Sequence, residues 1–239
     1  MPRRSARIAL AGAASALLAV APMTAVMVAL PATPAVAGQP AGYGPSDPFE
    51  DALMGQYGPA EPMKNMAKIV RTKYGYRFIA GQQHSRLTMT ITSNGSLRYR
   101  DTGTQRWKSL ARACKPRRVD VGVAAVCKRP ASTSRSNPTL LEVRPRLGND
   151  YIDARTLPAV FEMAVLADAG RDTVFTGRGN DFVNGAQDPD RIYGGAGKDW
   201  IRGGKGNDRL YGGADSDYIV GQAGWDTING GDGKDRIYQ

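Results

Sequence analysis

The chain has 239 residues and a net charge of +10, but the charge is distributed unevenly. Residues 38–166 carry 20 Lys and Arg against 10 Asp and Glu, whereas residues 167–239 carry 9 Lys and Arg against 12 Asp. The single histidine excludes a His-Glu-x-x-His zinc enzyme, and no Gly-x-Ser-x-Gly nucleophile elbow occurs. We therefore expect a protein that is not an enzyme, with a basic part followed by an acidic part.

The first 37 residues have the composition of a secretory signal peptide. Three arginines in the first seven residues precede an apolar run at 8–30, and Ala35-Val36-Ala37 offers a small-residue cleavage site. We therefore expect a secreted, extracellular protein. The apolar run is long for a signal and contains Pro22, so an uncleaved segment that anchors the protein in a membrane is the alternative.

A linker and a small β domain are expected next. Residues 38–63 are rich in Gly, Pro and small residues, which is typical of a disordered linker. Residues 64–140 predict a basic β domain, and Ser93-Asn94-Gly95-Ser96 is a hairpin signal between two of its strands. The strands of this domain are predicted at 74–79, 87–92, 97–100 and 119–126.

The two cysteines, Cys114 and Cys127, flank the last of these strands. In an exported chain they predict an intradomain disulfide, because two cysteines and one histidine are too few ligands for a zinc site. Basic residues cluster around the pair and predict contact with an anionic polymer such as nucleic acid or a cell-wall phosphate polymer. A solvated basic face is the alternative, and no nucleic-acid-binding module pattern occurs. The cluster consists of Arg112, Lys115, Arg117, Arg118, Lys128 and Arg129.

Residues 141–166 predict an irregular first coil. Asp150 and Ile152 have an Asp-x-aliphatic spacing that recurs later in the chain, but Asp150 is out of phase with the later residues. The segment 154–166 must therefore contain an insertion, and we expect a strand at 159–166.

Residues 167–238 consist of eight consecutive rows of nine residues. The row from Gly203 to Tyr211 fits the pattern G-G-x-G-x-D-x-U-x at every fixed position, and this pattern is known as a calcium-binding nonapeptide. The sixth position is Asp in all eight rows, as Asp172, Asp181, Asp190, Asp199, Asp208, Asp217, Asp226 and Asp235.

The repeat predicts a parallel β-roll in which two rows form one coil. The eighth position is always aliphatic, and stacked coils bury these side chains as a continuous column. Row n then lies above row n+2, which places four aspartates in a ladder on each side. Carboxylates roughly 5 Å apart repel by about 3 kcal/mol at an effective dielectric constant of 20. Carboxylates and turn carbonyls are ligands that Ca²⁺ prefers, so we expect several calcium ions; a metal-free roll is the alternative.

The C-terminal third resembles the RTX, or haemolysin-type, calcium-binding repeat family. The resemblance implies that a β-roll at 141–239 folds on binding calcium. It also implies that the eight sixth-position aspartates are metal ligands, with turn carbonyls as co-ligands. Three rows depart from the motif, at Ala167-Asp168, Asp188-Pro189 and Gln222. The order of an export signal, a two-cysteine β domain and repeats also resembles secreted calcium-binding proteins of actinobacteria.

Two columns of aromatic side chains are expected on the outer faces of the roll. Because rows two apart stack, the columns offer a binding strip for a glycan or a partner protein, and stacking that only stabilises the sheets is the alternative. The strand at 236–238 is expected to be an open edge that allows calcium-dependent self-association. One column consists of Phe182, Trp200 and Tyr218, and the other consists of Phe175, Tyr193 and Tyr211.

Together these features predict an all-β, secreted calcium-binding protein. We expect a calcium-dependent structural or adhesive module at the cell surface or in the extracellular matrix. The alternative is a protein whose basic domain binds an anionic polymer while the roll serves as a scaffold. A cell-wall polymer is favoured over nucleic acid as that partner.

Overall fold

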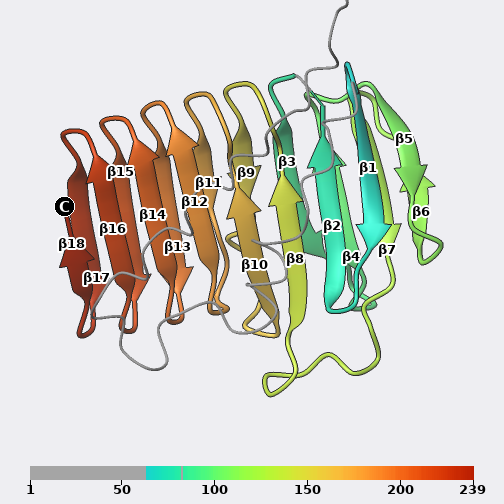
Figure 1. The fold of residues 1–239 in the computed structure, drawn as a ribbon. Coiled ribbons are helices and arrows are strands. Elements are labelled where there is room, and N and C mark those ends of the chain that lie inside the picture. Colours follow the sequence, from blue (N-terminus) through green and yellow to red (C-terminus); the bar gives the residue numbers. More distant parts are fainter. Residues whose placement is uncertain (1–62, 82) are drawn as a thin grey trace, which may run out of the picture. The chain divides into compact units, whose positions relative to one another are not determined.

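In the computed structural model, residues 63–81 and 83–239 are described, and every regular element among them is a β-strand (Figure 1). The all-β prediction is therefore confirmed for this part of the chain. Within these ranges, no helix has the length and apolar character needed to cross a membrane. The predicted signal peptide, its membrane-anchor alternative and the linker up to residue 62 lie outside the described residues.

The strands form two nine-stranded sheets. The first sheet contains, in spatial order, β18 (Arg236–Tyr238), β16 (Tyr218–Ala223), β14 (Trp200–Lys205), β12 (Phe182–Gln187), β10 (Phe161–Leu166), β8 (Thr139–Arg144), β2 (Gly75–Ala80), β1 (Met66–Arg71) and β5 (Arg106–Leu110). The second sheet contains β17 (Thr227–Asp232), β15 (Arg209–Ala214), β13 (Arg191–Ala196), β11 (Thr173–Phe175), β9 (Tyr151–Asp153), β3 (Arg86–Ile91), β4 (Leu97–Asp101), β7 (Val123–Cys127) and β6 (Cys114–Arg117).

From β8 to β18 the chain forms stacked parallel coils, which confirms the predicted roll. Successive strands alternate between the two sheets, and Val183, Ile201 and Ile219 are direct partners two rows apart. Strands β12 to β17 are each six residues long, which is longer than the last three residues of each row. They are longer because pairing continues into the following row, for example between Ala186 and Gly204.

The eighth-position aliphatic side chains form the core of the roll. Six of them are completely buried, and the seventh is partly buried. The last, Ile237, is 46% exposed, so the column opens to solvent at its C-terminal end. At its other end the column joins Leu87, Tyr99 and Phe78 in a single hydrophobic cluster. The buried members are Val174, Val183, Ile192, Ile201, Leu210 and Ile219.

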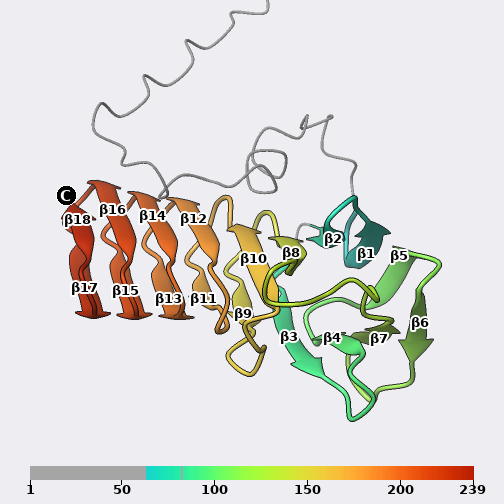
Figure 2. The ribbon, with the colours of Figure 1, turned by 90° about the horizontal axis from the view of Figure 1, so that it is seen from below.

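The segment that precedes the roll extends both of its sheets. Strand β2 pairs in parallel with β8, and β3 pairs in parallel with β9, so each sheet runs without a break from the roll into residues 66–127 (Figure 2). The hairpin signal is confirmed by the antiparallel pairing of β3 with β4 and by the bond from the Thr92 N–H to the Ser96 carbonyl. The two segments therefore share their sheets and their core.

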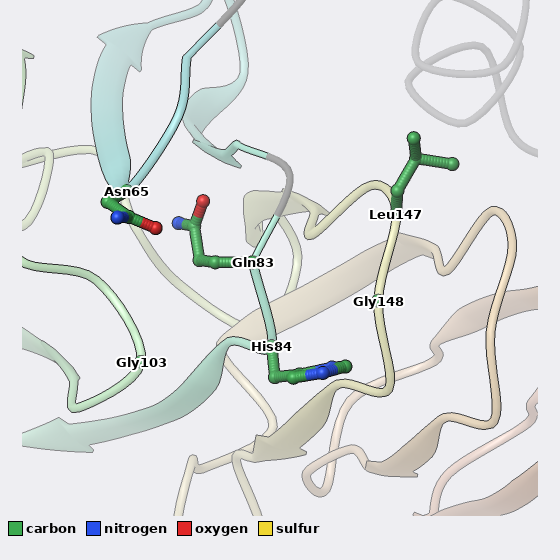
Figure 3. Close-up of a pocket in the computed structure, with 6 residues that line it drawn as sticks. All are labelled: Asn65, Gln83, His84, Gly103, Leu147 and Gly148. Atoms are coloured by element: carbon green, nitrogen blue, oxygen red, sulfur yellow. The ribbon is translucent and has the colours of Figure 1, made fainter.

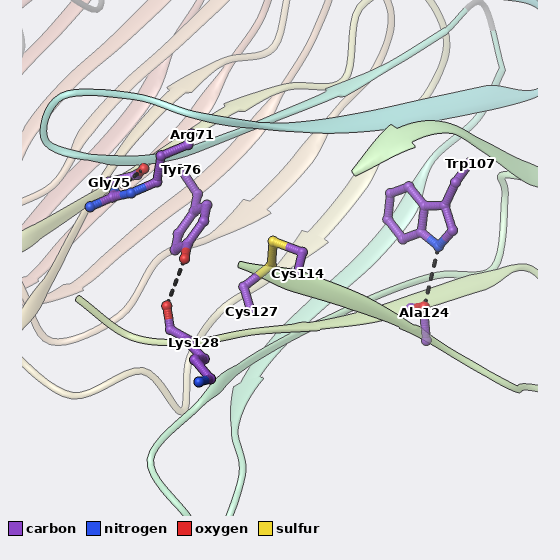
Figure 4. The surroundings of a disulfide bond; sticks show 8 residues. All are labelled: Arg71, Gly75, Tyr76, Trp107, Cys114, Ala124, Cys127 and Lys128. Atoms are coloured by element: carbon purple, nitrogen blue, oxygen red, sulfur yellow. Dashed lines mark hydrogen bonds between the residues drawn. A yellow bond between two sulfur atoms is a disulfide. The ribbon is translucent and has the colours of Figure 1, made fainter. Parts of the chain in front are cut away.

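The predicted disulfide joins Cys114 on β6 to Cys127 on β7, where the two residues are direct cross-strand partners (Figure 4). Nearby, the Tyr76 hydroxyl donates to the Lys128 carbonyl at 2.6 Å, and the Trp107 indole N–H donates to the Ala124 carbonyl at 3.2 Å. These bonds attach β7 and the residue that follows it to side chains of the first sheet.

Candidate metal centre

The sixth-position aspartates lie at the ends of the coils, each at the turn that precedes a roll strand. Asp172, Asp190, Asp208 and Asp226 precede strands of the second sheet, and the other four precede strands of the first sheet. In each ladder the backbone N–H of one aspartate donates to Oδ1 of the aspartate 18 residues later. The N···O distances are 2.8 to 3.0 Å. These bonds fix one oxygen of each carboxylate and leave the other to face the turn.

The second carboxylate oxygen, Oδ2, has no hydrogen-bond partner in six of the eight aspartates, although it is buried. A buried, unpaired carboxylate oxygen is costly, because it has lost water without gaining a donor. A Cβ added at Gly203 would lie 2.3 Å from Asp208 Oδ2 and 2.8 Å from the Gly221 carbonyl oxygen. Both oxygens therefore face the same space beside the turn. The six aspartates are Asp172, Asp190, Asp199, Asp208, Asp217 and Asp226.

Burial makes these carboxylates hard to ionise without a cation. Loss of water raises the pKa of Asp172 and of Asp190 to about 8, and it raises the pKa of Asp217 to about 7. The pKa of Asp199 is raised well above its usual value by burial and by the charges of Asp181 and Asp217. A bound cation would remove both the desolvation cost and the repulsion between successive coils.

The donor set of the turns fits a hard cation. Among the described residues, no three His, Cys, Asp or Glu side chains gather closely enough to hold a metal ion. A metal ion here would therefore be held by aspartates of successive coils together with backbone carbonyl oxygens. An all-oxygen set of this kind suits Ca²⁺, whereas structural zinc sites use His and Cys ligands.

The rows that depart from the motif keep the backbone of the turn. The second turn position has φ of 101° at Gly195 and 115° at Gly204, and it stays positive at Asp168 (81°) and Gln222 (78°). Asp188, which replaces the glycine at the fourth position, has φ of 70°. These left-handed residues are strained, so the departures cost stability but do not change the path of the turn.

The predicted aromatic columns are present on the outer sides of both sheets. On the first sheet, Trp200 makes edge-on contacts with Phe182 and Tyr218, at centroid distances of 5.2 and 6.0 Å. Phe182 and Tyr218 are buried, and Trp200 is half-buried. On the second sheet, Phe175, Tyr193 and Tyr211 stack in parallel at 4.5 and 4.6 Å and are half-buried.

One ladder continues beyond the eight predicted aspartates. Asp150 donates its backbone N–H to Asp172 Oδ1 at 2.7 Å, and Asp150 Oδ1 accepts from the Ser85 N–H at 2.5 Å. Burial raises the pKa of Asp150 to about 8. The Gly148-Asn149-Asp150 sequence was a visible signal for this coil. Ser85 carried no such signal, because it lies 65 residues earlier and has no carboxylate.

His84 lies at the same junction and is exposed. Its Nδ1 accepts the Asn149 N–H at 2.7 Å, and its ring extends toward the loop that carries Gly148 (Figure 3). It lines a pocket of about 640 Å³ together with Asn65, Gln83, Gly103, Leu147 and Gly148. The ring nitrogen Nδ1 is thus occupied by a structural hydrogen bond.

A parallel β-roll with buried, paired aspartates in its turns defines a solenoid of the calcium-binding type. Residues 165–192, 185–219 and 202–237 match the family described as RTX calcium-binding nonapeptide repeat (4 copies). The chain therefore carries RTX calcium-binding repeats over this segment. Neither the comparison with curated proteins nor the comparison with solved structures found a match.

Proposed function

We propose that the protein is secreted and that its roll is a calcium-dependent structural or adhesive module at the cell surface or in the extracellular matrix. The observation that carries this proposal is the set of six buried Oδ2 atoms without a donor, arranged along both ends of the coils. The eight sixth-position aspartates are the proposed ligands, with turn carbonyls beside them. Extracellular calcium-binding modules have dissociation constants of about 10⁻⁴–10⁻³ M. We therefore expect the roll to bind calcium outside the cell.

Retention on cells tests this function. The secreted form of the protein is incubated with cells of its source organism, washed in calcium or in EDTA, and quantified in the bound fraction. We expect retention in calcium and release in EDTA, and the double variant Asp199→Asn/Asp208→Asn should be retained less than the wild type. Equal retention in EDTA would rule out a calcium-dependent adhesive module.

The proposal includes no catalytic role. The β-roll of RTX repeats is a structural scaffold in its usual use, and its carboxylates are assigned to calcium here. The stacked rings of Phe175, Tyr193 and Tyr211 cover one another's faces, which supports the interpretation that the aromatic columns stabilise the sheets rather than bind sugars.

Self-association through the C-terminal end is also part of the proposal. Strands β17 and β18 occupy the ends of their sheets in the described part of the chain, and Ile237 and Tyr238 are 46% and 43% exposed. An open edge with apolar side chains pairs readily with a second copy. Light scattering in calcium should show a mass above that of a monomer. A monomer at all protein concentrations would refute self-association.

Binding of an anionic polymer is a second candidate function, favoured by the outer face of the second sheet. Arg98 and Arg100 on β4 lie two strands from Lys115 and Arg117 on β6, across the small side chains of β7. Two described carboxylates lie on strands of this sheet outside the ladder and the core. Asp153 on β9 is bound by Arg155, and Asp232 is exposed at the end of β17. The exposed cations of this face are Arg86, Arg98, Arg100, Lys115, Arg117, Arg191 and Arg209.

The salt dependence of binding tests this second function. With poly(glycerol phosphate) as the probe, Arg98→Gln/Arg100→Gln should reduce the slope of log Kd against log salt by about one for each lost phosphate contact. The matched control is Arg171→Gln/Arg178→Gln, which removes the same charge from exposed turn residues. Equal slopes for both variants would show that the face makes no specific contribution.

A further inference from the structure

The turn that precedes β9 has the backbone of a repeat turn, although it lies outside the matched repeats. Arg146 and Gly148 have positive φ angles of 76° and 129°. The corresponding residues of the first repeat turn, Asp168 and Gly170, have φ angles of 81° and 127°. Each turn ends in an aspartate that precedes a strand of the second sheet. The turn at 145–150 is therefore one more turn of the same kind.

This turn also stacks on its neighbour as the repeat turns stack on one another. A Cβ added at Gly170 would lie 2.0 Å from the Gly148 carbonyl oxygen, which leaves room for no side chain. The equivalent contact inside the repeats, from Gly197 to the Gly179 carbonyl oxygen, is 2.2 Å. The Arg171 N–H donates to Asn149 Oδ1 at 2.9 Å, and the Lys198 N–H donates to Asn180 Oδ1 at the same distance.

Two buried oxygens without donors lie in these neighbouring turns. Asp150 is 2% exposed and Asp172 is 1% exposed, and Oδ2 of each lacks a hydrogen-bond partner. The other oxygen of each carboxylate is already used, because Asp150 Oδ1 accepts from Ser85 and Asp172 Oδ1 accepts from Asp150. The unpaired oxygens therefore need a cation rather than a further donor of the chain.

We propose a calcium site between the turn at 145–150 and the turn at 167–172, with Asp150 and Asp172 as carboxylate ligands and turn carbonyls completing the shell. The proposal rests on the calcium-binding function proposed above and extends it beyond the repeats. The site also ties the roll to the segment before it. Asp150 and Asn149 hold the backbone of Ser85 and the ring of His84, which lead directly into β3, so calcium bound here orders the start of that strand.

Ion counting and amide exchange test the site in the full chain. Native mass spectrometry in calcium should find one ion fewer in Asp150→Asn than in the wild type. Asparagine keeps an oxygen for the Ser85 N–H but loses the charge, so the fold is retained. Hydrogen exchange at the Ser85 and Asn149 amides should be faster in this variant. The matched control, Asp226→Asn, removes a carboxylate at the far end of the same ladder and should leave these two amides protected.

The outcomes distinguish a failure of the proposed junction site from a failure of the proposed calcium-binding function. If Asp150→Asn binds as many ions as the wild type and exchange at both amides is unchanged, the junction site is refuted while the calcium-binding roll stands. If the wild type binds no calcium, both are refuted. Where Asp150→Asn does not fold, the wild type decides: equal protection of Ser85 and Asn149 in EDTA and in calcium overturns the proposal.

Discussion

At the residue scale, six of the eight sixth-position aspartates have one carboxylate oxygen that accepts a hydrogen bond and one buried oxygen without a donor. Asp208 Oδ1 accepts the Asp190 N–H at 2.8 Å, whereas its Oδ2 is buried without a donor. The hydrogen bond to Oδ1 sets the spacing of the coils, whereas burial of the charged Oδ2 destabilises the fold unless a cation binds it. The size of this destabilisation depends on the position of the aspartate in the ladder. Asp199 lies between two other carboxylates, whereas Asp235 ends its ladder and is partly exposed.

This difference predicts a ranking of calcium affinities. Asp199→Asn should weaken binding of the ions beside it at least about tenfold, because a carboxylate shared by two neighbouring coils is lost. Asp235→Asn should have a smaller effect, because only one neighbouring coil contacts that residue. Isothermal titration calorimetry measures both. Equal losses of affinity would show that position within the ladder is unimportant.

The raised pKa values predict an unusual pH dependence for the calcium-free protein. Asp150, Asp172 and Asp190 have pKa values of about 8 in the fold against the usual value of 3.8, so the fold favours their protonated forms. Their contribution to stability is complete below about pH 4 and is lost as the pH rises to about 8. In EDTA, the β signal measured by circular dichroism should therefore be larger at pH 5 than at pH 8.

Calcium should remove or reverse that trend, because binding requires the ionised carboxylates and releases protons. The same comparison of the β signal at pH 5 and pH 8 in saturating calcium is the control. A larger β signal at pH 8 than at pH 5 in EDTA would contradict the pKa assignments.

The sequence allowed prediction of the aspartates that recur in the repeats, but not of the residues at the end of the ladder beside β3. The eight sixth-position aspartates recur every nine residues, so their stacking follows from the repeat alone. Asp150 could be recognised from Gly148-Asn149-Asp150 but not placed, because the insertion before β10 breaks the phase. Ser85 and His84 could not be recognised at all. Their role depends on β3 pairing with β9, a contact between residues about 65 apart that no local pattern encodes.

At the scale of elements, a strand could be predicted from the sequence where buried and exposed residues alternate along it. The predicted strands near 74–79, 87–92 and 97–100 alternate clearly and correspond to β2, β3 and β4. Strand β6 was missed because it contains Pro116, which argues against a strand. Proline is tolerated there because β6 is the outermost strand of its sheet and the disulfide attaches it to β7.

The aromatic column on the first sheet predicts a structural role for Trp200. Its ring contacts Phe182 and Tyr218, and the Arg202 guanidinium lies 4.8 Å above it. Trp200→Ala should therefore lower the free energy of unfolding of the calcium form by about 1–3 kcal/mol, the value of two aromatic pairs. Urea titration measures the loss, and retention on cells per folded molecule should not change.

Trp225→Ala is the matched control for this substitution. Trp225 is 89% exposed on a turn, so its truncation should leave stability unchanged. If Trp200→Ala instead preserves stability and abolishes retention, the column is a binding strip and the structural role is wrong.

At the scale of the whole molecule, the roll and the segment before it form one folded unit in the described residues. Both sheets and the hydrophobic cluster run through the junction at β2–β8 and β3–β9. The sequence predicted a boundary at residue 140 between a basic β domain and the roll, but composition and charge report the surface rather than the core. We therefore predict that calcium bound in the roll also stabilises the disulfide-bearing segment.

The most direct test of the account is circular dichroism of the full chain in calcium and in excess EDTA. Binding free energy becomes folding free energy when the site does not exist in the unfolded chain. We predict a strong β signal in calcium and the loss of the roll's share of that signal in EDTA at pH 8, with full recovery when calcium is restored. An identical β signal in calcium and in EDTA would contradict the claim that the aspartate ladders make this fold depend on calcium.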